Sequence, residues 1–367
     1  MRLLLFADLH LDAPFAWAGP ALARRRRLAL RQALERIRDL VTELRVDALC
    51  CAGDLFEQER YTPDTAAFLR AVFADVHPVP VLLAPGNHDW YGPATLYRHV
   101  EWTDNVHVFT EPALRPYPLA DGLTLWGAAH CAPANTPGFL DDFRVDRGGV
   151  HLALFHGSEQ GGLVFEGQAK RPHAPFRAEQ IGAAGLHHAL VGHYHTPRDA
   201  PDHTYPGNPE PLTFGETGER APVLVTVGPD GSVRRERHPV AVTQVSDVAI
   251  DVSGAATSAE VRDRVAAVLA TASGVVRATI HGEIGTDVDL DLADLDGVAA
   301  HLGEQLVLRI GRITPAYDLE SLAQEPTVRG QFVRDVLEAA DLDEDERRRV
   351  IVTGLRALDG RHDLAVL

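Results

Sequence analysis

The chain has 367 residues, of which 45% are hydrophobic and 24% are charged. This length suits one large domain or two ordinary ones, and the apolar content excludes a chain that is mainly disordered. Three cysteines, of which Cys50 and Cys51 are adjacent, exclude a disulfide scaffold and fit a reducing compartment. No apolar run reaches the ~20 residues of a membrane-spanning helix. The opening MRLLLFADLH favours a strand over a signal peptide, because Asp8 follows a short apolar run. We therefore expect a cytoplasmic protein without a membrane contact.

The net charge of −17 argues against binding of nucleic acid through a broad basic surface. It does not exclude a phosphate-handling site, since bound divalent cations can be the largest local charges in such a site. The strongest positive run is four arginines at 24–27. Two interpretations of this run stay open: contact with phosphates, or the more frequent solvent-exposed helix face.

The first half of the sequence alternates predicted strands and helices. Short, continuous apolar runs predict buried strands at 3–7, 48–52 and 79–84. Apolar residues at helical spacing predict helices at 24–41 and 65–73. This order predicts a sheet of parallel strands with helices on its faces. Further strands are predicted at 106–109, 123–126, 150–155, 189–191 and 222–227, and a turn at 228–231.

A domain boundary is predicted near Val240, where the strand-rich part of the sequence ends. Beyond it, the sequence predicts a helix at 258–270, strands at 275–280 and 305–310, and two terminal helices at about 318–340 and 343–358.

Five short polar clusters stand where apolar strands end. In open α/β sheets, sites form at the carboxyl ends of the strands, so all five clusters could lie on one rim. Each cluster alone has an ordinary explanation, such as a turn or a solvent-facing histidine, but five in this arrangement favour one joint site. The clusters are Asp8-Leu9-His10, Gly53-Asp54, Gly86-Asn87-His88-Asp89, His156-Gly157 and Gly192-His193-Tyr194-His195.

The residue types in these clusters are suited to divalent metal ions. Carboxylates, imidazoles and an amide oxygen bind first-row divalent metals, and two ions ~3.5–4 Å apart can clamp a phosphate and activate a water. His88 is left over from the ligand set and is the candidate general acid, with Asp89 as the residue that orients it. The predicted ligands are Asp8, His10, Asp54 (bridging), Asn87, His156, His193 and His195.

Taken in order, the five clusters resemble the motifs of the calcineurin-like metallophosphoesterases over roughly residues 1–240. The resemblance implies an α/β fold (an α+β sandwich) with a four-layer αββα core and a dinuclear centre at the strand ends. It also implies that His88 is the catalytic acid, and together with the mixed oxygen and nitrogen ligands it favours Mn²⁺. Carried over position by position, it implies one ion on Asp8, His10, Asp54 and His195, and a second on Asp54, Asn87, His156 and His193.

Two further segments resemble the SbcD-type and YhaO-type DNA-repair nucleases of this superfamily. One is the Gly-Asp-Leu-Phe motif at 53–56, which Glu57 follows at a position that is often His in break-repair nucleases. The other is YPGNPEPLTFGE at 205–216, whose turn could approach a nucleic-acid strand closely. An ordinary turn at a sheet edge explains this block equally well. The candidate substrate-binding residues are Glu57, Tyr205, Gly207 and Asn208.

The resemblance implies a metal-dependent DNA exonuclease or endonuclease of DNA repair, in which His88 protonates the leaving 3′ oxygen. It implies a catalytic domain at 1–240, a small α/β capping domain at 241–315 and a helical segment at 316–367. Expected partners are DNA, a coiled-coil ATPase of the SbcC type docked on the last segment, and a second copy of the chain. The apolar stripes of that segment have an alternative use, packing on each other. Two other functions stay open: a phosphodiesterase of a small molecule such as a cyclic nucleotide, and a non-catalytic scaffold.

Overall fold

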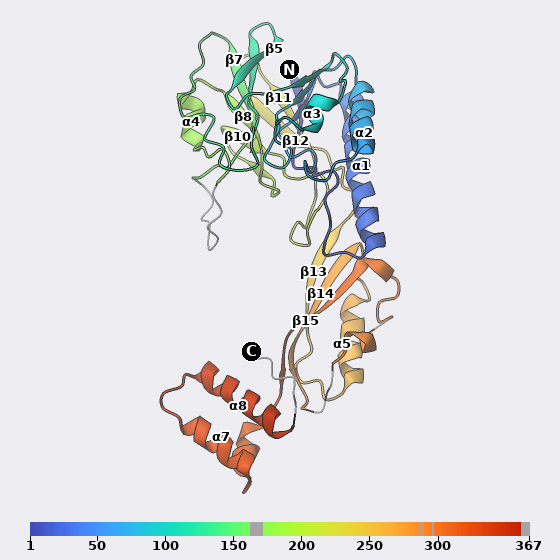
Figure 1. Cartoon of the computed structure of the whole chain (residues 1–367), viewed down its shortest axis with the longest axis vertical. Helices are drawn as coiled ribbons and strands as arrows, with labels where there is room; N and C mark the ends of the chain where they lie inside the picture. Colours follow the sequence, from blue (N-terminus) through green and yellow to red (C-terminus); the bar gives the residue numbers. More distant parts are fainter. Residues whose placement is uncertain (162–171, 287, 289, 296, 361–367) are drawn as a thin grey trace. The chain divides into compact units, whose positions relative to one another are not determined.

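A computed structural model describes residues 1–161, 172–286, 288, 290–295 and 297–360 (Figure 1). The predicted α/β fold class is confirmed: three sheets that contain parallel strands pack against helices. The chain divides into two compact units, Met1–Gln244 and Val245–Leu367. Among the described residues, no helix combines the length and apolar character needed to cross a membrane.

The first sheet has six strands in the order β12-β11-β1-β2-β3-β4. Strands β1 to β4 are mutually parallel, as the alternation of strands and helices predicts, whereas β11 runs antiparallel to β1 and β12 runs antiparallel to β11. The predicted turn at 228–231 joins β11 to β12. The bounds are β1 (Arg2–Phe6), β2 (Ala48–Cys51), β3 (Val81–Leu83), β4 (Val106–Val108), β11 (Val223–Val227) and β12 (Val233–Arg237).

Two long helices, α1 (Pro20–Glu43) and α2 (Pro63–Ala74), cover one face of this sheet. Each begins with a proline, whose fixed φ and missing N–H suit the first helical position. Their buried side chains pack on every second residue of β1, including Leu4 and Phe6. A short helix, α3 (Leu96–His99), lies farther along the chain.

The second sheet also has six strands, in the order β5-β6-β7-β8-β10-β9. Alternate β1 residues, Leu3 and Leu5, point away from α1 and pack with Leu152 and Leu154 of β7, so the two sheets share one core. On the other face of the second sheet lies α4 (Ala178–Ala183), opposite α1 and α2 (Figure 1). The layers therefore follow the predicted αββα order. The bounds are β5 (Arg115–Ala120), β6 (Leu123–Gly127), β7 (Val150–His156), β8 (His188–Gly192), β9 (Arg198–Asp199) and β10 (His203–Tyr205).

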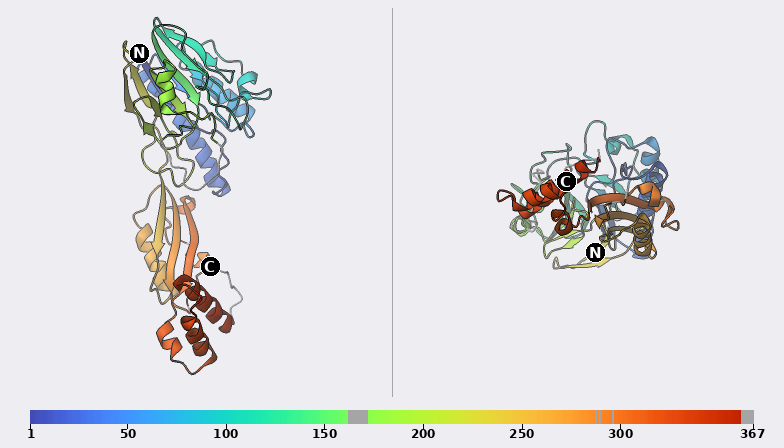
Figure 2. Two further views of the ribbon diagram at one scale, coloured as in Figure 1. Left: turned by 90° about the vertical axis from the view of Figure 1, so that its left-hand side faces the viewer. Right: turned by 90° about the horizontal axis from the view of Figure 1, so that it is seen from below.

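The second unit opens with a parallel sheet in the order β13-β14-β15, and α5 covers one of its faces (Figure 2). Val261, Val265 and Leu269 form the buried stripe of α5, at the three- and four-residue spacing of an amphipathic helix. The bounds are β13 (Val245–Asp251), α5 (Ser258–Leu269), β14 (Val275–Ile284), two 3₁₀ turns (Leu292–Leu295 and Gly303–Gln305) and β15 (Leu306–Pro315).

The predicted helix at 318–340 is wrong, because the structure breaks it into α6 (Leu319–Ala323) and α7 (Val328–Glu338). Pro326 lies in the break, where it has no N–H to donate to an intrahelical bond. Thr327 then starts α7 by accepting a hydrogen bond from the Gly330 N–H. Helix α8 (Glu344–Leu358) follows and packs on α7.

The arginine run at 24–27 divides between the surface and the interior of the first unit. Arg24 and Arg25 are exposed, but Arg26 is only 1% exposed. Its Nη1 lies 2.7 Å from Oε1 of the fully buried Glu210, and its Nη2 donates to the Pro211 carbonyl. Phosphate contact through the whole run is therefore excluded, since Arg26 is used to hold α1 against the segment after β10.

We expect Arg26→Met to lower the free energy of unfolding by about 3 kcal/mol or more, since Glu210 would keep a buried charge without its partner. Arg24→Met, two residues earlier on an exposed side chain, is the matched control and should change stability by less than ~0.5 kcal/mol. Denaturant unfolding of both variants checks the expectation. Equal, small losses would show that the ion pair does not stabilise the fold.

Candidate metal centre

The structure brings the seven predicted ligands together at one rim of the two sheets. Nε2 of His156 lies 3.2 Å from Oδ2 of Asp54, 3.1 Å from Oδ1 of Asn87 and 3.2 Å from Nδ1 of His193. On the other side of Asp54, its Oδ2 lies 3.6 Å from Nε2 of His10. Asp54 thus lies between two groups of histidines, as a bridging ligand would.

The loops that follow β1 and β2 aim the first ligands by pairing with each other. The Asp8 N–H donates to the Gly53 carbonyl at 3.0 Å, and the His10 N–H donates to the Asp54 carbonyl at 2.9 Å. Asp8, His10 and Asp54 have φ values of 55°, 51° and 52°, in the left-handed region that non-glycine residues rarely adopt. Such backbone strain is retained where surrounding structure fixes it, and it gathers at functional sites.

Gly86 shows how little space remains beside Asp54. A Cβ atom at this position would lie 2.3 Å from Asp54 Oδ1 and 2.7 Å from the Asp54 backbone nitrogen. Any side chain at residue 86 would therefore push the carboxylate out of the site. The φ of Gly86 is not in the left-handed region. Glycine is therefore required at this position for space and not for an unusual backbone conformation.

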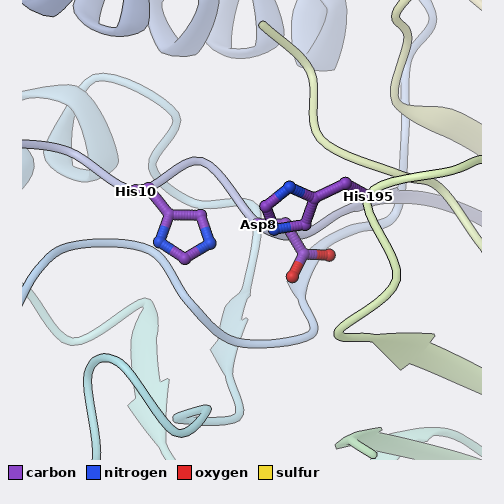
Figure 3. A group of neighbouring side chains, drawn as sticks. All are labelled: Asp8, His10 and His195. Atoms are coloured by element: carbon purple, nitrogen blue, oxygen red, sulfur yellow. The ribbon is translucent and has the colours of Figure 1, made fainter. Parts of the chain in front are cut away.

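Asp8, His10 and His195 form the first ligand group (Figure 3). His10 and Asp8 come from the loop after β1, and His195 comes from the loop after β8. One ligand atom from each of the three residues lies within 4.8 Å of the others. His10 Nε2 is buried and has no hydrogen-bond partner. An unpartnered imidazole nitrogen beside carboxylates fits a metal ion, which accepts the lone pair of a neutral histidine.

Asp54, Asn87, His156 and His193 form the second group. His156 Nδ1 lies 2.9 Å from the Ala52 carbonyl, which can only accept, so Nδ1 donates and Nε2 faces the other ligands. Although burial opposes a charge on His156, the Asp54 carboxylate raises the pKa of this histidine to about 9. The proton on Nε2 and a divalent cation are alternatives at the same place, since both neutralise the same carboxylates.

The electrostatics of the rim favour positive charge. Burial raises the pKa of Asp8. It would also raise the pKa of Asp54, but the neighbouring His156 and His10 hold that pKa well below its usual range. Two carboxylates in a water-poor site are costly unless cations pair with them. The donor set therefore fits divalent ions by charge as well as by ligand type.

Glu57 lies between His10 and His88. Its Oε1 lies 2.8 Å from His10 Nδ1, and its Oε2 lies 3.0 Å from His88 Nδ1. Although burial favours a higher value, hydrogen bonds from both imidazoles lower the pKa of Glu57 to about 2. The hydrogen bond to Glu57 in turn raises the pKa of His88 to about 9. Glu57 is therefore occupied by two histidines, in place of the substrate contact that the sequence suggested.

The expected role of Asp89 is corrected by its contacts. Its carboxylate is fully buried and accepts hydrogen bonds from the N–H groups of Asp54 (3.1 Å), Leu55 (2.8 Å) and Gly86 (2.6 Å). The Tyr97 hydroxyl donates a fourth bond at 2.6 Å. Asp89 thus ties the loops after β2 and β3 together, and it is Glu57 that contacts the His88 ring.

The expected substrate contacts of Tyr205, Gly207 and Asn208 are also corrected, because all three residues are buried. The Tyr205 hydroxyl donates to the Gly157 carbonyl at 2.7 Å, next to His156. Gly207 has a φ of 75°, and a Cβ there would lie 2.6 Å from the His195 carbonyl oxygen. Residues 205–208 therefore pack behind the metal-ligand loops, where the side chains of Tyr205 and Asn208 are not available to a substrate.

Glu216 was missed as a site residue. Its Oε1 lies 2.8 Å from Nδ1 of His195. The available signal was its place as the glutamate that ends the 205–216 block, but the pattern of that block indicated a turn and not a contact with a ligand histidine.

Comparison with known proteins identifies the family. Residues 1–197, more than half of the chain, match the calcineurin-like phosphoesterases. The chain belongs to this family. Calcineurin-like phosphoesterases are metal-dependent hydrolases of phosphate esters, and the rim described above has the donors that such chemistry needs.

This calcineurin-like phosphoesterase is similar to the DNA double-strand break repair protein Mre11 of Methanopyrus kandleri, with 30% identity over 306 residues. The alignment covers 72% of the present chain and 62% of the Mre11 protein, so the chain spans less than two thirds of that relative.

Three solved structures were also found to be similar over part of the chain. TT1561 of Thermus thermophilus has a TM-score of 0.38 at 15% identity, covering 64% of this chain and 98% of its own. Yfce, a phosphoesterase from E. coli, has a TM-score of 0.29 at 15% identity, with coverage of 65% and 99%. A dimetal phosphatase from Danio rerio has a TM-score of 0.34 at 14% identity, with coverage of 61% and 92%.

We expect Asp89→Asn to lower the free energy of unfolding by about 2 kcal/mol or more. The asparagine NH₂ would face buried N–H groups that have lost their acceptor. Tyr97→Phe removes one hydroxyl donor and leaves the carboxylate, so its loss should be about 1 kcal/mol. Thermal and denaturant unfolding measure both. Wild-type stability in Asp89→Asn, combined with lost turnover, would instead support a direct contact between Asp89 and His88.

Proposed function

We propose that this calcineurin-like phosphoesterase is a DNA nuclease of the SbcD type that uses two metal ions. The observation that carries the proposal is a complete ligand set beside His88, whose side chain is 45% exposed while the ligands around it are largely buried. An exposed imidazole at the edge of a buried metal site is suited to meet a substrate. The similarity to the Mre11 repair protein supports DNA as that substrate.

In this proposal the ligand residues divide as the family resemblance implies. Two divalent ions, held at this rim, supply Lewis-acid polarisation of the phosphodiester and lower the pKa of a water. The chain's own contribution is a fixed geometry, since paired loops and buried hydrogen bonds hold the carboxylates before substrate arrives. One ion would bind Asp8, His10, Asp54 and His195, and the other would bind Asp54, Asn87, His156 and His193.

His88 is proposed to protonate the leaving 3′ oxygen. Its backbone N–H donates to Asp54 Oδ1 at 2.8 Å, which fixes the residue beside the bridging carboxylate. Its ring packs edge-on to His10, with centroids 4.7 Å apart. Because Glu57 accepts from Nδ1, the second nitrogen, Nε2, is the atom left to donate a proton to substrate. A positioned acid of this kind contributes ~10²–10⁴ in rate.

Further parts of the proposal extend to the second unit and to partners. We propose that residues 241–315 form a cap that selects the form of DNA, and that Mn²⁺ is the activating ion of this cytoplasmic enzyme. Helices α7 and α8 bury Val333, Val336, Ile351 and Leu355 against each other. Docking on an SbcC-type ATPase, or on a second copy of the chain, would therefore have to use side chains left exposed, such as Val350.

We expect His88→Ala to keep both metal ions and to lose turnover by ~10²–10⁴-fold. Asp54→Ala should lose metal as well as activity, because it removes the ligand shared by both groups. His99→Ala, on an exposed histidine of α3, is the matched control and should behave as wild type. Metal content by mass spectrometry and single-turnover DNA cleavage separate the three variants. Full activity in His88→Ala would rule out His88 as the acid.

The substrate class is tested by parallel hydrolysis of end-labelled linear DNA and a cyclic nucleotide with Mn²⁺. Cleavage of DNA that a chelator abolishes, and that His88→Ala lacks, is the expected result. Turnover of the cyclic nucleotide alone would move the assignment to a small-molecule phosphodiesterase. Bound metal without hydrolysis of either substrate would favour the scaffold or a requirement for the ATPase.

A further inference from the structure

We propose that Glu216 is the positioning residue of His195. Its carboxylate accepts the Nδ1 proton of His195 and so directs the Nε2 lone pair to the first metal ion. The segment from Tyr205 to Arg220 holds this glutamate in place. The inference deepens the proposed function and rests on it only in taking His195 as a metal ligand.

The two oxygens of Glu216 have different tasks. Oε1 lies 2.8 Å from Nδ1 of His195, and because a carboxylate only accepts, that nitrogen must carry a proton. A neutral imidazole then has its lone pair on Nε2.

Oε2 of Glu216 fixes the carboxylate to the chain. It accepts hydrogen bonds from Asn208 Nδ2 (2.6 Å), the Leu212 N–H (2.6 Å) and the Thr213 N–H (3.3 Å). With three donors on this oxygen, the carboxylate is held against rotation away from His195. Its side chain is 13% exposed, so water competes weakly for these bonds.

Arg220 links the hydrogen bonds of Glu216 to the main chain of the loop that carries His195. Its Nη1 donates to the His195 carbonyl at 2.6 Å and to Asn208 Oδ1 at 2.8 Å. The same Asn208 gives its NH₂ to Glu216 and to the Glu210 carbonyl. His195 is therefore held at its main chain through Arg220 and at its ring through Glu216. This arrangement explains why buried polar residues fill the segment.

The first ligand group differs from the second in these outer contacts. His10 and His195 each give Nδ1 to a glutamate, Glu57 and Glu216 respectively, whereas His156 gives Nδ1 to a backbone carbonyl. A carboxylate partner makes a ligand imidazole a stronger donor, and loss of such a partner typically lowers metal affinity about 10–100-fold. The ion on Asp8, His10 and His195 should therefore be the one that depends on Glu216.

The variant Glu216→Gln offers a sharp test, because the side-chain amide has one oxygen that accepts and one NH₂ that donates, whereas both carboxylate oxygens accept. The donors of Asn208, Leu212 and Thr213 require the amide oxygen at the Oε2 position. The NH₂ then faces Nδ1 of His195 and forces the proton onto Nε2, where it blocks the metal. In Glu216→Ala the His195 imidazole can adopt either tautomer. This variant also removes the oxygen that accepts from Asn208, Leu212 and Thr213.

The experiment titrates Mn²⁺ into the full chain by calorimetry and measures thermal unfolding alongside. We expect Glu216→Gln to unfold near the wild-type temperature and to lose about 10–100-fold in affinity for one of two ions. Glu216→Ala should be less stable, yet bind that ion no worse than Glu216→Gln. Glu219→Gln, an exposed glutamate in the same segment, is the charge-matched control and should bind both ions as wild type.

Glu216→Gln with wild-type affinity for both ions would overturn the proposal, as would weakening of both ions equally. A purely structural role predicts the opposite order of variants, with glutamine binding better than alanine. Nitrogen-15 spectra of the wild-type protein loaded with diamagnetic Zn²⁺ add a test that needs no variant. A proton on Nε2 of His195 and metal on Nδ1 would overturn the inference.

Failure of this inference is distinguishable from failure of the proposed function. Metal affinities and histidine tautomers are measured without any substrate, so they report on Glu216 even if the protein does not cleave DNA. Conversely, DNA cleavage that persists in a Glu216→Gln protein with unchanged metal affinity would overturn only the role of Glu216.

Discussion

Two buried carboxylates that need positive charge are the constraint on which the site depends. Asp8 and Asp54 are almost completely removed from water, and the loops that carry them have left-handed backbone at the same residues. Burying two carboxylates has a desolvation cost that only nearby positive charge can offset. The neighbouring histidines supply part of that charge when they are protonated, and divalent ions supply more. The hydrogen bonds of Asp89, Glu57 and Glu216 all serve to hold this cluster before an ion binds.

The two-sheet architecture explains how five separate segments reach the same place. The first sheet supplies the loops after β1, β2 and β3, and the second supplies His156, the last residue of β7, and the loop after β8. The sheets pack face to face through Leu3, Leu5, Leu152 and Leu154, so strand ends from different sheets become neighbours. A residue at the carboxyl end of one of these strands thereby lies in the site. Short loops are therefore enough to place the ligands.

The sequence predicted the parts of the fold that follow from periodicity. Buried parallel strands are continuous apolar runs, so β1, β2 and β7 were recognisable, and polar clusters at their ends indicated the ligands. Strand β5 was missed because Pro116 and Pro118 cannot donate to a ladder and are confined to edge strands. The hydrogen-bond partners of the site residues were harder to predict from the sequence. Adjacency suggested that Asp89 serves His88, but the side chain of Asp89 points into the protein, and residue order along a loop does not reveal that direction.

The contact of α1 with the end of the first unit has a consequence for how this enzyme can be divided. Glu210, which holds Arg26, also accepts the N–H of Val242 at 2.8 Å, and Arg36 donates to the carbonyls of Val240 and Ala241. The segment after β12 is thus hydrogen-bonded to α1. A shortened protein that ends at residue 239 would strip acceptors from Arg36 and a donor from Glu210. A fragment that keeps all of these hydrogen bonds must extend through Thr243, whose N–H also donates to Glu210.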